Sequence, residues 1–145
     1  MEFLIVVTIT AILASVGISS YINQQRTKLL EFTTQEIVGY LRYAQQKSIG
    51  QEGGNQWGIH FENPVSGDDF YALYTGTTYS SPEETRYLPK QIEYEAPVTD
   101  NSINISFDKL TGTSATSTTQ SITIKSTVTN STTTISISGQ GLISY

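Results

Sequence analysis

Residues Phe3 to Ile22 read FLIVVTITAILASVGISSYI, a run without a charged side chain that follows one carboxylate, Glu2. A helix of about 20 residues, rising about 1.5 Å per residue, is long enough to cross the hydrocarbon core of a bilayer. The run therefore predicts a membrane-spanning helix at the start of the chain.

Small or hydroxylated residues recur along one side of this helix, at Thr8, Ala11, Ser15 and Ser19. Helices in lipid associate through close backbone approach and shared hydroxyl hydrogen bonds, because apolar surface alone gives no preference for a neighbouring helix over acyl chains. We interpret the stripe as a helix-packing face.

Glu2 stands at the edge of the apolar run. A carboxylate there is costly unless it is protonated, reaches water or meets a cation. Two interpretations follow from the position alone. Glu2 is a solvated acid in the first turn, favoured by the helix dipole, or it pairs with a cation that a partner supplies.

The order of residues from Glu2 to Tyr21 is a glutamate, an apolar run with small residues interspersed, and a tyrosine nineteen places on. This order resembles the N-terminal helix of type IV pilins and type II secretion pseudopilins. The resemblance implies that Glu2 meets the free, usually methylated, N-terminal amine of a neighbouring subunit during filament assembly. It also implies a subunit that waits in the bacterial inner membrane and then enters an extracellular filament.

Two features depart from the family pattern. Family members carry a basic leader, a glycine and then four residues ahead of the glutamate, whereas only Met1 precedes Glu2 here. Either the numbered sequence begins inside a longer reading frame, or the mature subunit is unusually short at this end. Ser19 stands where many pilins have a helix-loosening proline, and Gly17 with the neighbouring serines is a weaker helix breaker.

Composition limits what the remaining chain can be. The 145 residues leave room for one small domain beyond the apolar helix. A net charge of -5, with scattered basic residues, argues against a nucleic-acid-binding surface. The chain has no cysteine, which excludes disulfides and thiolate chemistry.

The helix is predicted to continue from Asn23 to Ser48, where the sequence contains no proline and one glycine, Gly39. One side is apolar and is predicted to pack on a sheet through Leu30, Ile37, Leu41 and Ala44. Gly50 and the following glycines end the helix. We therefore divide the chain into a hydrophobic helix (1–22), an amphipathic continuation (23–50) and a β-sheet domain (51–145).

After Gly54 the apolar period changes from 3.6 to 2, which indicates strands. The predicted strands include Trp57–Glu62, Phe70–Thr75, Ile92–Glu95 and Ile103–Phe107, followed by a hairpin of 122–128 with 135–137. Residues 80–84 are predicted as a connection and 113–119 as an exposed loop. The predicted fold class is α+β, a long N-terminal helix packed on an antiparallel sheet, as in type IV pilins.

The order of these parts also resembles, more loosely, the H-type pseudopilins and their fimbrial relatives. Some members of that branch bind DNA through arginines near a C-terminal glycine turn. The corresponding turn here, Gly139-Gln140-Gly141, has no arginine nearby. We therefore expect no nucleic acid among the partners.

The sequence offers little catalytic chemistry. His60 is the only histidine, and no nucleophile with a base is apparent. Asp68-Asp69 lacks the spaced ligands of a calcium loop. We expect no enzyme, no metal and no cofactor. Five tyrosines could instead form a sugar-binding surface or pack in the core, namely Tyr71, Tyr74, Tyr79, Tyr87 and Tyr94.

The sequence thus favours a pilin, the structural subunit of a helical homopolymer that pilus or secretion machinery assembles. Three alternatives stay open: a minor pseudopilin of a type II secretion-like system, a membrane-tethered module that binds glycans or surfaces, and, least favoured, a membrane-tethered enzyme.

Overall fold

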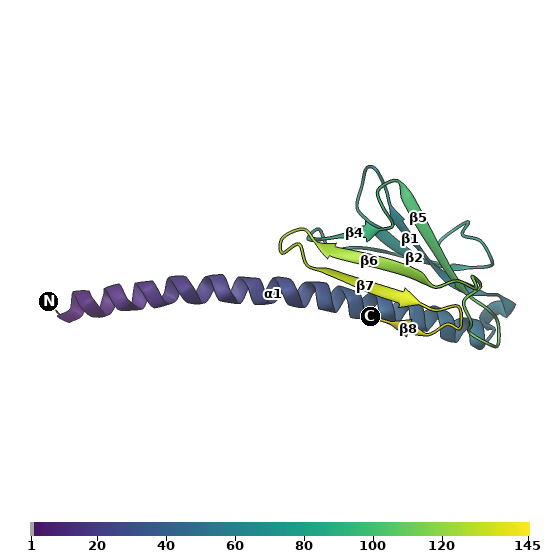
Figure 1. Ribbon diagram of the computed structural model, residues 1–145, viewed down its shortest axis with the longest axis horizontal. Coiled ribbons are helices and arrows are strands. Elements are labelled where there is room, and N and C mark those ends of the chain that lie inside the picture. Colours follow the sequence, from purple (N-terminus) through teal and green to yellow (C-terminus); the bar gives the residue numbers. More distant parts are fainter. Residues whose placement is uncertain (1) are drawn as a thin grey trace.

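The computed structural model describes the backbone of residues 2–145 and the side chains of residues 5–8, 10 and 28–145. Helix α1 (Glu2–Ile49) is one continuous element of 48 residues, which at about 1.5 Å per residue is about 70 Å long. The sheets cover only its C-terminal part, and the N-terminal part projects beyond them (Figure 1).

The end of α1 is fixed by Ser48, which is fully buried. Its hydroxyl accepts a hydrogen bond from the backbone N–H of Trp57 at 2.7 Å. Gln51 then takes a left-handed conformation, and the short 3₁₀ helix η1 (Glu52–Gly54) turns the chain into the first strand. This polar contact positions the first strand directly after the helix.

The strands form two antiparallel sheets of four strands each. The first sheet has the order β3-β2-β1-β5 and consists of β1 (Trp57–Asn63), β2 (Phe70–Thr75), β3 (Glu84–Tyr87) and β5 (Asn101–Phe107). The second has the order β4-β6-β7-β8 and consists of β4 (Ile92–Ala96), β6 (Gln120–Ser126), β7 (Thr132–Ile137) and β8 (Ile143–Ser144). The predicted α+β fold class, a long N-terminal helix on antiparallel strands, is confirmed.

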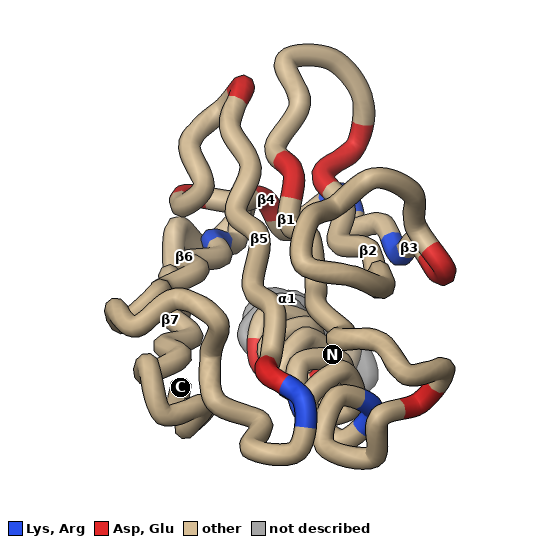
Figure 2. The backbone as a smooth tube through the Cα atoms, turned by 90° about the vertical axis from the view of Figure 1, so that its right-hand side faces the viewer, with Lys and Arg blue, Asp and Glu red and all other residues tan. Residues whose placement is uncertain are grey.

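The core lies where α1 meets both sheets. Seen along the helix, β6 and β7 lie to one side of α1, and β2 and β3 lie to the other (Figure 2). Apolar residues from all three layers are buried together, among them Ile37, Leu41, Ile59, Phe61, Phe107, Ile122, Ile124 and Ile135. The isoleucines of β6 and β7 face each other directly, since Ile122 pairs with Ile135.

Three local predictions were incomplete or wrong. The edge strand β3 overlaps the end of the predicted 80–84 connection, and its partly exposed residues lack the alternation that marks a strand. Val128 lies in the turn after β6 and is 40% exposed, whereas we predicted it within a strand. Most of segment 113–119 is exposed as predicted, but Ser114 is buried and bridges to Phe107.

Candidate functional site

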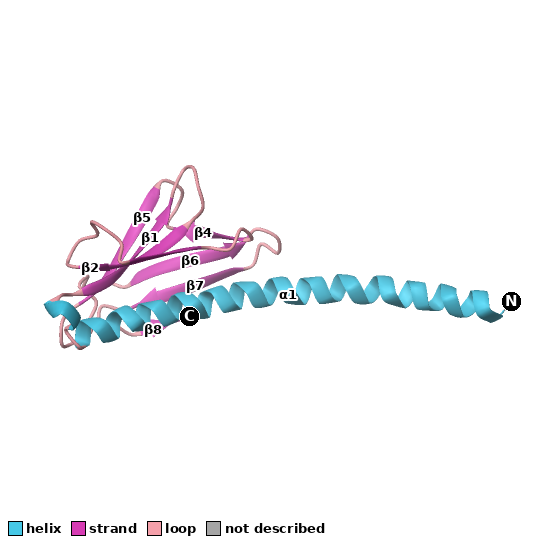
Figure 3. Ribbon diagram, turned by 180° about the vertical axis from the view of Figure 1, so that it is seen from behind, coloured by secondary structure: helices cyan, strands magenta, loops and turns pink. Residues whose placement is uncertain are grey.

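The predicted assembly residues lie in the part of α1 that projects beyond the sheets, which Figure 3 shows from behind. Glu2 is the first residue of α1. Its side chain lies outside the described residues, as do those of Ala11, Ser15 and Ser19. Thr8 is described and exposed.

Apolar surface surrounds the described start of this helix. Ile5, Val6 and Val7 are 59%, 59% and 48% exposed. Successive helical residues are about 100° apart around the axis, so these three side chains point in different directions. Exposed apolar side chains on several sides of a helix favour apolar surroundings.

The opposite end of α1 has a buried side. Leu30, Ile37, Leu41 and Ala44 are at most 5% exposed, and Ile37 and Leu41 belong to the core that both sheets share. Sequence analysis missed three further buried residues on this side, namely Thr33, Thr34 and Val38. Their positions widen the buried surface beyond the narrow stripe that the apolar spacing indicated.

A polar and aromatic cluster joins the exposed side of α1 to the edge strand β3. The Tyr40 hydroxyl donates to Glu84 Oε1 at 2.8 Å. Arg86 donates to the same oxygen through Nε at 2.9 Å, and its guanidinium lies 5.5 Å from the centre of the Tyr40 ring. These hydrogen bonds lower the pKa of the Glu84 carboxyl, the Tyr40 bond more than the Arg86 bond. The cluster holds β3 against the helix.

Tyr71 extends the cluster into the core. Its hydroxyl donates to Glu36 Oε1 at 2.9 Å, and its ring makes an edge contact with Tyr40 at 5.4 Å between centroids. Burial, followed by the bond to Glu36, raises the pKa of the Tyr71 hydroxyl far above its usual value. Tyr71 therefore acts as a neutral hydrogen-bond donor at any physiological pH.

Beside this cluster, an open groove of about 430 Å³ runs between α1 and β3. Its lining residues are Glu36, Gly39, Tyr40, Tyr43, Glu84 and Arg86. Aromatic rings, carboxylates and a guanidinium thus face the same space. This combination suits the binding of a polar molecule with an apolar face.

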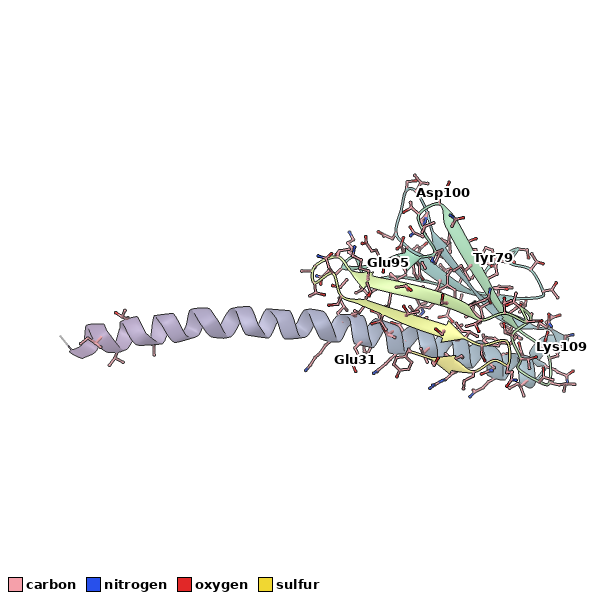
Figure 4. The ribbon with its side chains drawn as sticks, viewed as in Figure 1. Glu31, Tyr79, Glu95, Asp100 and Lys109 are labelled. Atoms are coloured by element: carbon pink, nitrogen blue, oxygen red, sulfur yellow. The ribbon has the colours of Figure 1, made fainter. Side chains whose placement is uncertain are left out.

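His60 has partners on both ring nitrogens. Nδ1 lies 2.6 Å from Asn104 Oδ1, and Nε2 lies 3.0 Å from Glu62 Oε2. The ring of Tyr79 stacks on the imidazole at 3.7 Å between centroids. Tyr79 lies in the loop after β2 and is labelled in Figure 4. His60 is 4% exposed, so it is a buried structural residue and is not placed to act as a base on a substrate.

Most of the five tyrosines, which we weighed as a sugar-binding surface or as core packing, are not on the surface. Tyr71, Tyr74 and Tyr94 are buried, and Tyr79 covers His60. Only Tyr87 is largely exposed, at 65%. The core and cross-strand packing that we weighed as the alternative accounts for most of the five.

Asp68 and Asp69 have separate environments. Asp68 is exposed, whereas the half-buried Asp69 accepts a hydrogen bond from the backbone N–H of Tyr94 at 2.8 Å. Burial raises the pKa of the Asp69 carboxyl, more than this hydrogen bond lowers it. Among the described side chains, no group of three or more acidic residues and histidines is arranged to hold a metal ion.

Three chain segments meet at the C-terminal end of α1. Gln45 Nε2 donates to the carbonyl oxygens of Gly112 at 2.8 Å and Gly141 at 2.9 Å. A Cβ on Gly139 would lie 2.5 Å from the carbonyl oxygen of Ser117. The glycine turn that we examined for DNA contacts is thus packed against two loops and the helix.

Comparison with solved structures identifies the fold. A crystal structure of the type IV minor pilin FimU from Pseudomonas aeruginosa matches with a TM-score of 0.56 and 15% sequence identity, covering 79% of this chain and 86% of that chain. This chain has a type IV pilin-like fold. At this identity the likeness concerns the fold alone.

Comparisons of the sequence itself find no relative of this chain. No protein-family model matches the chain. No curated protein matches its sequence either.

The predicted membrane span, residues 3–22, consists mostly of residues whose side chains are not described. Over the residues that are described, no helix combines the length and the apolarity needed to cross a membrane.

Sequence analysis did not find the groove. Its residues come from α1 and from an edge strand 44 positions further along the chain, as the bond from Tyr40 to Glu84 shows. Gly39 was the available signal, because an interior glycine weakens a helix and usually has a packing or functional reason. Sequence spacing alone does not predict that Gly39 and Arg86 line the same groove.

Proposed function

We propose that this chain is a structural subunit of a type IV pilus-like filament and polymerises through the N-terminal part of α1. The observation that supports the proposal is the contrast between the two ends of α1. Among its described side chains, the buried ones lie from Leu30 onward, whereas Ile5, Val6 and Val7 are apolar and exposed. Lipid supplies apolar surroundings for such a segment before assembly, and neighbouring helices supply them in a filament.

Before assembly, the subunit waits in a bacterial inner membrane with residues 3–22 as its span. Assembly machinery moves it into the filament, where lipid contacts are exchanged for contacts with neighbouring helices. Thr8, Ala11, Ser15 and Ser19 form the close-packing face between helices. Each contact joins two different surfaces, so the subunits form an open fibre.

Glu2 sets the axial register of this fibre. An ionised carboxylate in apolar surroundings requires a cation. The N-terminal amine of the adjacent subunit supplies it, as the resemblance to type IV pilins implies. Only one axial offset between neighbours brings the two groups together.

Electron microscopy of filaments sheared from cells, with mass spectrometry of their main protein, tests the proposal. We expect thin filaments made of this chain in the wild type and none with Glu2→Ala. The matched control is Glu31→Ala, which removes an exposed carboxylate from the same helix, beneath the sheets (Figure 4). Filaments that persist with Glu2→Ala would exclude the proposed role of Glu2.

A minor subunit is the second candidate, because the structural neighbour is a minor pilin. The same experiment separates the two. A major subunit dominates the sheared material, whereas a minor pilin or a minor pseudopilin of a secretion system is scarce in it. A membrane-tethered glycan-binding module would be absent from filaments and monomeric in detergent.

A further inference from the structure

Gly39 is an interior residue of α1 that packing within the described chain does not explain. A Cβ added there meets no described heavy atom within 4 Å. A glycine inside a helix costs about 0.5–1 kcal/mol relative to alanine. The absent side chain leaves the helix backbone open to a molecule from outside.

Gly39 lines the groove between α1 and β3, whose volume is about 430 Å³. Small-molecule sites occupy about 300–1,000 Å³. The groove lies over the part of α1 that the sheets hold, and its other wall is the edge strand β3. Both walls are therefore anchored to the folded domain.

The walls retain hydrogen-bonding capacity for a ligand. Glu84 accepts from Tyr40 and Arg86 through Oε1, and Glu36 accepts from Tyr71 through Oε1. A carboxylate has two oxygens and about four acceptor sites, and a guanidinium has five N–H donors. Planar groups of this kind form paired hydrogen bonds with adjacent hydroxyls.

Tyr43 supplies an aromatic surface at the same groove and is 46% exposed. An aromatic face attracts the positively polarised C–H groups of a sugar ring. Two carboxylates and one guanidinium give the lining a formal charge of -1, on a chain of net charge -5. This charge disfavours phosphates, sulfates and sialic acids.

We propose that the groove between α1 and β3 binds a neutral saccharide. The ring lies over Gly39 against Tyr43, and its hydroxyls bond to Glu36, Glu84 and Arg86. The site is separate from the tyrosine surface that we weighed in the sequence analysis, most of whose tyrosines are buried. It is also independent of filament assembly through the N-terminal part of α1.

The test uses the full chain in detergent micelles on an array of maltotriose, chitotriose, N-acetyllactosamine and sialyllactose, followed by calorimetric titration of the best ligand. We expect a neutral sugar to bind. Gly39→Val places a branched side chain where the sugar ring would lie and should weaken binding at least about tenfold. Arg86→Gln should weaken it similarly, because a ligand hydrogen bond is lost.

Gln35→Val is the matched control, since Gln35 is an exposed residue on the same helix and is not part of the lining. It should leave affinity within about twofold. Thermal unfolding of each variant shows that the fold is kept. No binding of any neutral sugar, binding that survives Gly39→Val, or a preference for sialyllactose would each overturn the proposal.

Filament formation by Gly39→Val separates this proposal from the assembly function. Normal filaments with lost sugar binding support a ligand site. Lost filaments with intact sugar binding would assign the groove to a second copy of the chain and overturn the proposal. Loss of filaments in Glu2→Ala alone leaves the saccharide site unaffected.

Discussion

Gly141 has a left-handed φ of 80°, and a Cβ there would lie on the carbonyl oxygen of Gly112 and 2.7 Å from Gln45 Nε2. We predict that Gly141→Ala destabilises the domain, because it adds a steric clash to the backbone penalty. The left-handed conformation costs about 1–2 kcal/mol, and overpacking adds about 1–3 kcal/mol. Urea unfolding of the full chain in detergent measures the sum.

Gly54→Ala provides the control for the backbone penalty alone. Gly54 has a φ of 71°, and a Cβ there meets no described atom within 4 Å. We expect it to cost about 1–2 kcal/mol. Equal losses for the two variants would show that the contact with Gly112 and Gln45 gives way without cost.

The half-buried carboxyl of Asp69 links stability to pH. Its pKa is raised in the folded state, mainly by burial. Its contribution to stability is therefore complete below the unfolded pKa of about 3.9 and is lost as the pH rises through the folded pKa. We predict that Asp69→Asn, which keeps an oxygen for the Tyr94 N–H, gains stability relative to the wild type between pH 3.5 and pH 7.

Chemical unfolding at both pH values measures this difference. Asp68→Asn is the control, because Asp68 is exposed next to Asp69. It should change stability by less than about 0.5 kcal/mol at either pH. A difference between Asp69→Asn and the wild type that stays constant with pH would contradict the assignment.

Among the elements, β3 depends on the helix for its position. It pairs with β2 on one side only, and the Tyr40 hydroxyl ties Glu84 to α1. We predict that Tyr40→Phe costs about 0.5–1.5 kcal/mol and speeds amide hydrogen exchange in β3 more than in β1. Tyr87→Phe, on the exposed side of β3, is the control and should change neither the stability nor the exchange rate in β3.

The hydrogen bond from Tyr40 to Glu84 also makes the stability cost of Tyr40→Phe depend on pH. The pKa of Glu84 is lowered in the folded state, so its contribution is present above the unfolded pKa and is lost as the pH falls through the folded pKa. The cost of Tyr40→Phe should therefore be larger at pH 7 than at pH 3. A cost that is larger at pH 3 would contradict this role of the carboxylate.

The elements differ in how far the sequence reveals them. The apolar side of α1 repeats at helical spacing, and β1, β2, β5 and β6 alternate, so each is visible locally. The edge strand β3 is not, because its side chains are partly exposed on both faces. Alternation also assigns the faces of a strand without naming its neighbours, so the division into two sheets was not predicted.

The groove was hidden for a similar reason. Tyr40 and Glu84 are 44 positions apart and meet only because β3 pairs with β2 and β2 packs on α1 through Tyr71. His60 shows the converse. Its position on an alternating strand does not reveal whether its side chain is exposed, and the ring of Tyr79, from the loop after β2, stacks on it and leaves it 4% exposed. Long-range contacts decide both sites.

At the scale of the whole molecule, α1 has two parts. Its C-terminal part belongs to the folded domain, and its N-terminal part, before residue 28, forms a stalk. Among the described side chains of the helix, the first one buried in the core is Leu30, and the N-terminal part of the helix projects away from the sheets (Figure 1). The domain and the stalk are therefore expected to be energetically separable. In the proposed filament, this separation lets the stalk change its surroundings from lipid to protein while the domain keeps its structure.

A truncated chain of residues 28–145 tests this separation. We predict that it folds as a monomer without detergent and unfolds within about 5 °C of the full chain, a shift of about 1 kcal/mol or less. The control chain, residues 42–145, lacks Leu30, Ile37, Val38 and Leu41. Truncating each such buried residue to alanine costs about 2–5 kcal/mol. Losing all four therefore costs about 8–20 kcal/mol, which is as large as the total of about 5–15 kcal/mol that holds a small domain together. Circular dichroism should show that the shorter chain is unfolded. If residues 28–145 were unfolded as well, the stalk would be part of the folding unit, and a subunit could not exchange its surroundings without disturbing the domain.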